Sequence, residues 1–576
     1  MERQVEKKAK QWLEASNLDE DSRRTINLLL EPKNLEELDE AFYKDLEFGT
    51  GGLRGIMGVG SNRINKYTIG KATQGLSNYL NKTFPGENIS VAVAHDSRNN
   101  SKLFASICAD VFSANNIKVY LFEDLRPTPE LSFTVRHFGC KSGVVLTASH
   151  NPKEYNGYKA YWEDGAQVTP PHDENIIAEV NAIIKLDDIK FQRKPDLVES
   201  IGSEVDEIYL DTLSDLALSP DAVKRQSDMK IVFSPIHGTG AMLVPAILKR
   251  LGFNNITLVE EQMSADGNFP TVVYPNPEES EALKLALDKA KEINADLIMA
   301  TDPDADRVGI AVRNTQNELQ LLNGNQTGAL LIHYLLSRWS ETGKIAGNQY
   351  VVKTIVTTDL IASIAKHYQI DCFDTLTGFK YIATMIRELE GKMEFIGGGE
   401  ESYGYLIGDK VRDKDAVASC AMIAEMAAFY KDNGRSLFEQ LMEIYQQFGF
   451  YYEDLKSITK KGKRGAEEIQ EMMSGFRNSP PTQLGGSQVV ELLDYNNLTK
   501  KNILTGKTEP LNFPKSNVLQ FITEDGSKIS ARPSGTEPKI KFYFGVKLNE
   551  FIIEKPQRNF EEAEKKIKRI QSDLNL

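Results

Sequence analysis

Three aspartates at alternate positions, Asp302, Asp304 and Asp306, follow an apolar run that reads Ile298-Met-Ala-Thr. Clustered carboxylate oxygens suit Mg²⁺ better than zinc, which prefers nitrogen and sulfur ligands. An EF-hand calcium loop fits less well, because the glycine required at its sixth position is missing and no helix is expected before it. Three carboxylates this close repel one another strongly without a cation. The segment therefore predicts a metal site rather than a plain acidic turn.

A serine and a histidine, Ser149 and His150, follow a short apolar run, Gly143-Val-Val-Leu146, after two intervening residues, and Lys159 lies further along. A serine placed at a strand end beside these groups could be a nucleophile or a phosphoryl acceptor. The surroundings do not form a G-x-S-x-G elbow, which disfavours a hydrolase triad. A Ser/Asn/Pro turn without chemistry is the alternative reading.

Two further polar segments could recognise a sugar. Glu400 and Ser402 lie in a Gly-rich stretch, Gly397–Gly404, and their side chains can hydrogen-bond vicinal hydroxyls. Lys380 ends the segment Thr377-Gly-Phe-Lys, which is equally ambiguous by itself. Each segment could also be a solvated turn.

The segment Arg532-Pro-Ser534-Gly535-Thr536 combines a cation, two hydroxyls and a Gly-exposed backbone. These are the hydrogen-bond donors that a phosphate dianion requires, although a basic turn between strands has the same composition. A second Gly-flanked arginine, Arg54, lies near the N-terminus.

The elements that must position these residues repeat one pattern in three regions, which begin at Ile89, Lys230 and Tyr350. Each region has an apolar run, a polar or Gly-rich loop, an amphipathic helix and, in the first two regions, a second apolar run. Apolar runs without alternation indicate parallel strands buried on both faces. Ligands of such sheets bind beyond the carboxyl ends of the strands, where the loops lie. We therefore expect three doubly wound, mixed α/β domains.

The C-terminal part has a different pattern. From Gly485 onward, short alternating runs are separated by turns such as Asp525-Gly526, and a closing helix carries apolar residues from Phe560 to Leu574. This predicts an antiparallel sheet with a helix, an α+β domain, and the polar stretch Ser457–Arg464 reads as a linker or domain edge. The expected domains span residues 1–205, 206–324, 325–450 and 451–576.

Composition excludes several classes of protein. The chain has 576 residues with 68 basic and 82 acidic side chains, a net charge of −14, which disfavours nucleic-acid binding. It does not exclude a small anionic ligand, because salt screens charge beyond about 8 Å. The N-terminus is too charged for a secretory signal, and no apolar run approaches the ~20 residues of a membrane span. Four scattered cysteines fit a reducing compartment, so we expect a cytoplasmic protein of undetermined oligomeric state.

Taken together and in this order, the loops are far more specific than any one of them. The chain resembles the α-D-phosphohexomutase superfamily, which includes phosphoglucomutases and phosphomannomutases, from about Phe48 to Tyr543. In that family TASHNP is the phosphoserine loop, DPDADR the metal loop, GEESYG the sugar loop and RPSGTEP the phosphate loop. The resemblance implies four domains around a central cleft, with one loop from each.

The resemblance also implies roles for the matching residues. Ser149 would carry the phosphoryl group, and Mg²⁺ would be bound by its phosphoserine oxygen and the three aspartates. The other residues implied near the reacting serine are His150, Lys159, Arg54 and Arg307. Glu400 and Ser402 would hold the sugar O3 and O4 with help from Lys380. The non-transferring phosphate would be held by Arg532, Ser534, Gly535 and Thr536. Lys541 departs from the arginine frequent in relatives and lacks its bidentate fork.

The sugar loop is more similar to the glucose type than to the GEMSGH type of many dual-specificity phosphomannomutases. The GTGGLRG and TGFKYI segments resemble the branch with phosphoglucomutase 2-like and phosphopentomutase-like enzymes. We therefore expect interconversion of glucose 1-phosphate and glucose 6-phosphate, with glucose 1,6-bisphosphate as intermediate and activator. Pentose or mannose phosphates remain open as substrates. A phosphatase and a non-catalytic sugar-phosphate sensor are the more distant alternatives.

Overall fold

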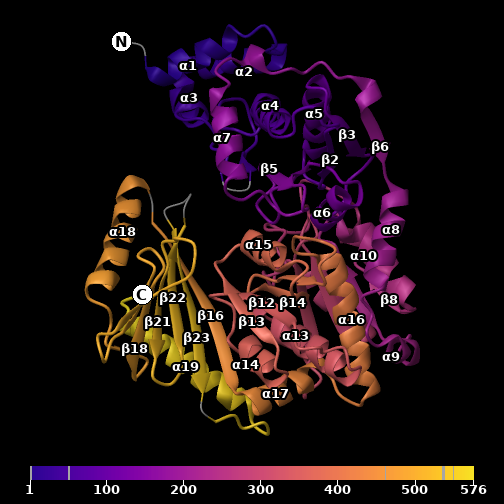
Figure 1. Ribbon diagram of the computed structural model, residues 1–576, viewed down its shortest axis with the longest axis vertical. Coiled ribbons are helices and arrows are strands. Elements are labelled where there is room, and N and C mark those ends of the chain that lie inside the picture. Colours follow the sequence, from indigo (N-terminus) through magenta and orange to yellow (C-terminus); the bar gives the residue numbers. More distant parts are fainter. Residues whose placement is uncertain (1–2, 50–51, 461, 535–538, 549) are drawn as a thin grey trace.

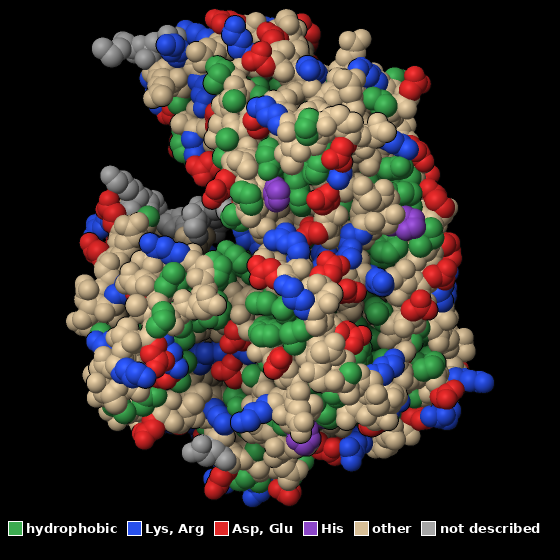
Figure 2. Space-filling model, in the orientation of Figure 1, with side chains coloured by type: hydrophobic (Ala, Val, Ile, Leu, Met, Phe, Trp, Pro, Cys, Tyr) green, Lys and Arg blue, Asp and Glu red, His purple; other side chains and the backbone are tan. Residues whose placement is uncertain are grey.

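The computed structural model describes residues 3–49, 52–460, 462–534, 539–548 and 550–576. Four sheets follow one another along the chain, and each belongs to one domain. The domains lie along an arc that runs from the N-terminal domain at the top of Figure 1 to the C-terminal domain at the lower left. Figure 2 shows that the molecule is deeply hollowed between these two ends of the arc.

The first domain has a six-stranded sheet in the order β1-β5-β4-β2-β3-β6. Its strands are β1 (Gly52–Ile56), β2 (Ser90–His95), β3 (Lys118–Phe122), β4 (Ser142–Leu146), β5 (Tyr155–Trp162) and β6 (Val198–Ile201). Its longer helices are α1 (Gln4–Leu13), α2 (Glu20–Leu29), α3 (Leu35–Phe42), α4 (Lys66–Thr83), α5 (Ser101–Ala114), α6 (Thr128–His137) and α7 (His172–Ala182). The N-terminal helices α1–α3 are held by a cluster in which Trp12 packs edge-on against Phe42 and Tyr67.

The second domain has the strand order β11-β10-β9-β7-β8. Its elements are α8 (Ser203–Ser214), α9 (Pro220–Arg225), β7 (Ile231–Ser234), α10 (Gly240–Leu251), β8 (Ile256–Leu258), α11 (Glu260–Met263), α12 (Lys284–Ile293), β9 (Leu297–Thr301), β10 (Val308–Arg313) and β11 (Leu319–Leu322). Gly252 caps α10 in the left-handed conformation, as the sequence suggests.

The third domain has the strand order β13-β12-β14-β15. Its elements are α13 (Gly324–Glu341), β12 (Gln349–Thr354), α14 (Leu360–His367), β13 (Asp371–Thr375), α15 (Phe379–Leu389), β14 (Glu394–Glu400), β15 (Gly404–Ile407), α16 (Ala416–Asp432) and α17 (Leu437–Phe448).

The fourth domain is an antiparallel sheet in the order β16-β23-β22-β21-β18-β19-β20, with β17 paired to β18. Its elements are β16 (Phe450–Thr459), α18 (Gly462–Asn478), β17 (Gln483–Leu484), β18 (Ser487–Asp494), β19 (Thr499–Asn502), β20 (Thr508–Pro510), β21 (Leu519–Thr523), β22 (Lys528–Pro533), β23 (Lys539–Leu548) and α19 (Pro556–Asp573).

The expected fold class is confirmed. The central strands of the first three sheets are parallel and buried, and antiparallel strands such as β5, β10 and β15 extend them at one edge. The fourth domain is α+β. The boundaries at residues 205, 324 and 450 remain our proposal. No helix in the described part of the chain is long and apolar enough to cross a membrane.

Two local predictions are wrong. Of the two interpretations of Ser457–Arg464, the linker is wrong and the domain edge is consistent with the structure. The segment begins inside β16, the edge strand of its sheet, which pairs with β23 as far as Thr459 while alternate polar side chains face solvent. The supposed loop Gly397–Gly399 belongs to β14, because glycines let this strand approach β12. A Cβ on Gly398 would lie 2.3 Å from the carbonyl oxygen of Val352. Polar or Gly-rich composition was taken for a loop in both cases.

The chemistry-bearing segments lie at the carboxyl ends of strands. Ser149 follows β4, Asp302 follows β9, and Glu400 ends β14. The fourth domain contributes the end of β22, which carries Arg532.

A helix contact in the first domain provides a test of packing. Gly75 lies in α4, and a Cβ there would be 2.4 Å from Val180 Cγ2 and 2.8 Å from the Val180 backbone nitrogen in α7. Alanine favours a helix interior by about 1 kcal/mol over glycine, but forcing the helices apart costs roughly 1–3 kcal/mol. We expect Gly75→Ala to lower the thermal unfolding midpoint. The matched change Gly475→Ala in α18, where no atom lies within 4 Å of the added Cβ, should raise it. A rise in both variants would contradict the packing argument.

Candidate active site

The acidic loop after β9 brings its three aspartates together. One carboxylate oxygen from each of Asp302, Asp304 and Asp306 lies within 4.8 Å of the others, and all three residues are buried. Asp302 Oδ1 accepts hydrogen bonds from the backbone N–H groups of Asp306 and Arg307, at 3.0 Å each, which curls the loop around this carboxylate. The sequence prediction of a compact acidic cluster is confirmed.

The donor set of this cluster fits a divalent metal ion. Asp304 Oδ1 and Asp306 Oδ1 are buried and accept no hydrogen bond from any residue that the structure describes. Burial, followed by repulsion from Asp304 and Asp306, raises the pKa of Asp302 well above its usual range. A divalent cation would satisfy the free oxygens and relieve this repulsion, and hard oxygen ligands are those that Mg²⁺ prefers. The buried triad can therefore hold a metal.

Ser149 points at this cluster from a different domain. Its Oγ donates a hydrogen bond to Asp302 Oδ2 at 2.9 Å and lies 3.1 Å from His150 Nδ1. The serine has a positive φ of 51°, an uncommon conformation for a non-glycine residue outside turns. Its backbone N–H donates to Thr147 Oγ1 at 2.8 Å, which helps to hold the turn.

Arg98 holds the serine loop in place, and the sequence analysis assigned it no role. Its guanidinium donates to four backbone carbonyls, those of Ser149 (2.6 Å), Asn151 (2.5 Å), Pro152 (2.8 Å) and Tyr155 (3.1 Å). Its side chain is fully buried, pairs with Asp96 and stacks on Phe269 of the second domain. The signal in the sequence was a cation just beyond the carboxyl end of β2.

Two lysines from different domains neutralise the acidic loop. Lys159 Nζ of β5 lies 2.7 Å from Asp304 Oδ2 and 3.2 Å from Asp306 Oδ2. Lys414 Nζ, from the segment before α16, lies 3.2 Å from Asp306 Oδ2 and 3.0 Å from Asp413 Oδ1. Burial raises the pKa of Asp306, but Lys414, Lys159 and Arg307 together outweigh burial and hold this pKa well below the usual range.

The two carboxylates also affect the pKa of Lys159. Burial lowers its pKa, and the carboxylates of Asp304 and Asp306 outweigh burial, so that the pKa lies above its usual range. Lys414 was missed by the sequence analysis, and its signal was the charged run Arg412-Asp-Lys-Asp415 in an apolar context.

The remaining cations border the same cluster. Arg54 Nη1 donates to Asn151 Oδ1 at 3.2 Å, so the guanidinium of Arg54 contacts the serine loop. Arg307 Nη1 lies 2.5 Å from Glu278 Oε1, a partner on the segment before α12 that the sequence analysis did not select.

The sugar segments are joined to each other. Glu400 Oε1 accepts a hydrogen bond from the backbone N–H of Gly378 at 2.8 Å, so that two segments that were ambiguous in isolation form one structure. Lys380 lies in the first turn of α15. Burial lowers its pKa while Asp173 of the first domain opposes this shift. Ser402 is half-buried in the turn between β14 and β15.

The fourth domain contributes a pair of cations. Arg532 on β22 lies directly opposite Lys541 on β23, and the backbone N–H of Ser534 donates to the carbonyl of Lys539 at 2.7 Å. Like charges at opposite positions of a sheet are destabilising, so this pair suits an anion between them. Gly535 and Thr536, predicted to bind phosphate, lie outside the described residues.

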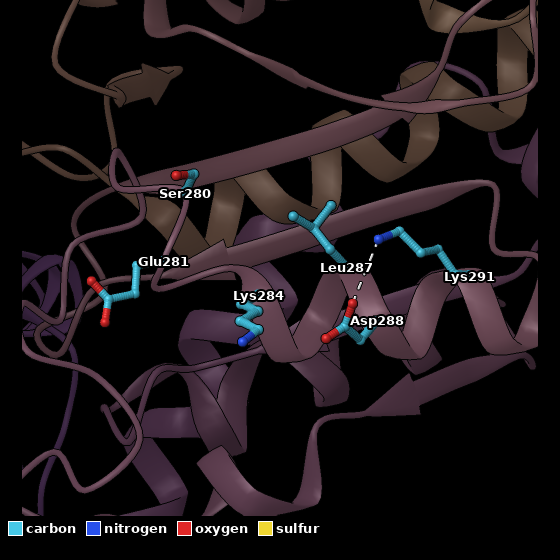
Figure 3. Close-up of a pocket in the computed structure, with 6 residues that line it drawn as sticks. All are labelled: Ser280, Glu281, Lys284, Leu287, Asp288 and Lys291. Carbon is cyan, nitrogen blue, oxygen red and sulfur yellow. Dashed lines mark ion pairs between the residues drawn. The ribbon is translucent and has the colours of Figure 1, made fainter.

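A shallow groove of about 430 Å³ runs along α12 and is bordered by Ser280, Glu281, Lys284, Leu287, Asp288 and Lys291 (Figure 3). None of the acidic, serine or sugar segments lines it, so we do not place the site there.

Comparison with known proteins decides the family. Models of the phosphoglucomutase/phosphomannomutase α/β/α domains I, II and III match residues 45–187, 207–316 and 323–448. A phosphoglucomutase of Staphylococcus epidermidis (strain ATCC 35984) is 38% identical over 523 residues, 90% of this chain and 94% of that protein. The chain belongs to the phosphoglucomutase/phosphomannomutase family. It is therefore a mutase of the α-D-phosphohexomutase superfamily, as its motifs predict.

Other relatives cover nearly the whole chain. A phosphoglucomutase of Staphylococcus aureus (strain MSSA476) is 37% identical and covers 96% of this chain and 97% of its own length. Among solved structures, the open form of pp63/parafusin from Paramecium has a TM-score of 0.68 at 19% identity, covering 92% of this chain and 96% of its own. A family protein from Burkholderia thailandensis has a TM-score of 0.64 at 20% identity, covering 90% and 97%. These structures share the fold.

The role of Arg98 gives a prediction for this mutase family site. Replacing Arg98 by methionine removes the donors that hold four carbonyls of the serine loop. A displacement of about 1 Å at a reacting group can cost 10²-fold, so we expect kcat/KM to fall by roughly that factor.

The matched control is Arg313→Met. Arg313 donates to the carbonyls of Ala295 and Asn317 at 2.7 and 2.8 Å within the second domain, away from the serine loop. Both variants should lose thermal stability, and only Arg98→Met should lose activity. Equal activity losses in the two variants would refute a specific role for Arg98.

Proposed function

We propose that this mutase interconverts glucose 1-phosphate and glucose 6-phosphate through a phosphorylated Ser149 and glucose 1,6-bisphosphate. The observation that carries the proposal is the 2.9 Å contact between Ser149 Oγ and Asp302 Oδ2, which joins a serine of one domain to the acidic cluster of another. A serine in an ordinary surface turn would not require a partner from another domain, because water or its own loop could form hydrogen bonds with its hydroxyl.

The acidic cluster would hold Mg²⁺ through Asp302, Asp304, Asp306 and an oxygen of phosphorylated Ser149. When bound, this ion supplies positive charge that neutralises phosphoryl oxygens. Lys159 and Arg307 border the same carboxylates and add further positive charge. Phosphoryl transfer depends mainly on positioning and on such neutralisation.

The transfer breaks the bond between phosphorus and Ser149 Oγ and forms a bond between phosphorus and the free hydroxyl oxygen of the sugar phosphate. The hydroxyl loses its proton to a base, and Ser149 Oγ takes up a proton as the leaving oxygen. The resulting bisphosphate reorients within the cleft, and its other phosphoryl group is then transferred to Ser149. In the second transfer Ser149 Oγ gives up this proton, and the sugar oxygen that releases its phosphoryl group takes one up. His150, 3.1 Å from Oγ, and Arg54 of β1, which donates to Asn151 of the serine loop, would orient the reacting groups.

Recognition is divided between the last two domains. Glu400 and Ser402, with Lys380, would hold the sugar O3 and O4. Arg532 and Ser534, with Gly535 and Thr536, would hold the phosphate that is not transferred. Lys541 would add charge opposite Arg532, without the bidentate geometry of an arginine. A fixed phosphate clamp combined with contacts to two hydroxyls accommodates both orientations of the bisphosphate.

The phosphoglucomutases of two Staphylococcus species support glucose as the sugar. Pentose and mannose phosphates are the alternative substrates, and a panel of the three sugar types separates them. A phosphatase would release inorganic phosphate from the same serine, and a sensor would show no turnover. The cytoplasmic location expected from the sequence is part of the same proposal.

Phosphorylation of Ser149 is directly measurable. After incubation with glucose 1,6-bisphosphate and Mg²⁺, the intact mass of the wild type should include one added phosphate. Ser149→Ala should gain none and should lose mutase turnover by orders of magnitude, because the phosphoryl acceptor is gone. Its thermal midpoint should stay close to wild type, since the change is small. Ser402→Ala is the control and should still be phosphorylated. Near-normal turnover of Ser149→Ala would disprove the assignment.

The two recognition loops should respond differently to substitution. A charge-assisted contact to a phosphate contributes about 1.5–3 kcal/mol, so Arg532→Ala should raise KM about 10-fold or more for every accepted sugar. Glu400→Gln should instead change the ratio of kcat/KM among glucose, mannose and ribose phosphates, because an amide donates where a carboxylate only accepts. If Arg532→Ala shifted the sugar ratio and Glu400→Gln scaled all three equally, the division of labour would be reversed.

A further inference from the structure

The strand that carries Arg532 is fastened to the third domain. Lys528, Ser530 and Arg532 occupy alternate positions of β22, so their side chains leave the same face of the sheet. The contacts of Lys528 and Ser530 show which neighbour this face meets.

Lys528 makes an ion pair across the domain boundary. Its Nζ lies 2.8 Å from Asp359 Oδ1, at the start of α14 in the third domain. The same oxygen lies 2.9 Å from Nζ of Lys353, which is 1% exposed and also pairs with Asp374 at 2.8 Å. Two largely buried ammonium groups thus meet two carboxylates that are 40% and 43% exposed. Removing Lys528 leaves Asp359 paired with Lys353 of its own domain, so the ion pair between the third and fourth domains is lost.

A second contact lies one step further along β22. Gln520 Nε2 of β21 donates to the carbonyl of Ile355 at 2.8 Å and to Ser530 Oγ at 2.9 Å. Around it, Ile355 and Val356 pack with Tyr543 and other apolar residues of the fourth domain. Both contacts are made by one segment of the third domain, Lys353–Asp359, which ends β12 and leads into α14.

The same segment also holds the sugar loop. The hydroxyls of Thr354 and Thr357 both lie 3.2 Å from Glu401 Oε2. Glu401 stands between Glu400 and Ser402, the two residues proposed to read the sugar. The segment Lys353–Asp359 is therefore fixed to the sugar loop on one side and to β22 on the other.

We propose that Lys528 and Asp359 are positioning residues that set Arg532 relative to Glu400 and Ser402. The inference rests on the proposed function, in which Arg532 grips phosphate and the other two contact the sugar. Lys528 touches no reacting group. Its pairing with Asp359 anchors one end of β22, and Arg532 lies near the other end, four residues and roughly 14 Å away at about 3.4 Å per strand residue. A loosened anchor would move the phosphate clamp without altering its chemistry.

The test compares Lys528→Met with a matched ion pair inside the fourth domain. Lys566 of α19 lies 2.7 Å from Asp525, and its side chain is 9% exposed, against 13% for Lys528. Lys566→Met therefore removes a similar buried cation without touching the third domain. We expect Lys528→Met and Asp359→Asn to raise KM for glucose 1-phosphate roughly 10-fold, with kcat changed less than about 3-fold. Lys566→Met should lower the thermal midpoint and leave KM near wild type.

Two further variants test whether the change in KM comes from loss of the ion pair between Lys528 and Asp359. Lys528→Arg keeps the charge and should keep KM within about 3-fold of wild type. The double variant Lys528→Met/Asp359→Asn should raise KM no more than the larger single effect, because both changes remove the same contact. An unchanged KM in Lys528→Met, or additive effects in the double variant, would overturn the inference.

A different experiment applies if the proposed role of Arg532 in phosphate binding is wrong. If Arg532→Ala leaves KM unchanged, the proposed role of Arg532 is wrong, and the anchor is then judged by small-angle X-ray scattering of the substrate-free protein. Lys528→Met should increase the radius of gyration relative to wild type, and Lys566→Met should not. Equal radii in wild type and Lys528→Met would show that the ion pair does not hold β22 on the third domain.

Discussion

Burial of three carboxylates within 4.8 Å of one another is the constraint on which the arrangement of the first three domains depends. Such a cluster is tolerated only with nearby positive charge, and the chain supplies this charge from outside the loop. Lys159 comes from the first domain and Lys414 from the third, while Thr128 of the first domain donates a hydrogen bond to Asp304. The acidic loop of the second domain is therefore the place where three domains meet. The contacts that compensate the charge of the acidic loop are therefore also contacts that hold the three domains together.

This arrangement explains how a protein with net charge −14 can bind an anion. The excess of acidic residues is distributed over a large surface and is screened within about 8 Å. Within the site, the cations Lys159, Arg307 and Lys414 are paired with carboxylates of the same acidic cluster that would bind a metal. Local geometry, and not the sum of charges, sets the potential that a phosphorylated sugar meets.

The fourth domain is attached by contacts of another kind. Its sheet meets the segment Lys353–Asp359 through an ion pair, an amide hydrogen bond and a small apolar cluster. Strand β22, which carries Arg532, is thus positioned by contacts other than those of the acidic and serine loops. In the proposed function, this separation suits a phosphate clamp that serves two orientations of one intermediate, because the clamp can be positioned without moving the reacting serine.

Local patterns in the sequence determined much of this molecule. Apolar runs followed by polar loops identified the strands of the α/β domains, and Ser149 and Asp302 could be selected because each follows such a run. The structure then decided which of these loops meet.

Three charged residues could not be chosen from the sequence, namely Arg98, Glu278 and Lys414. An isolated charge next to a strand or helix is common, and it acquires its role only from partners far along the chain. Lys159 could be selected from its place after the serine segment, but its ion pair with Asp304 joins two domains and is seen only in the tertiary structure. Glycines of β14 and polar residues of β16 were read as loops because their composition is typical of loops, whereas backbone pairing across the sheet made them strands. Composition and spacing are properties of neighbours in sequence, but charge compensation and strand pairing depend on neighbours in space, and only the tertiary structure fixes those.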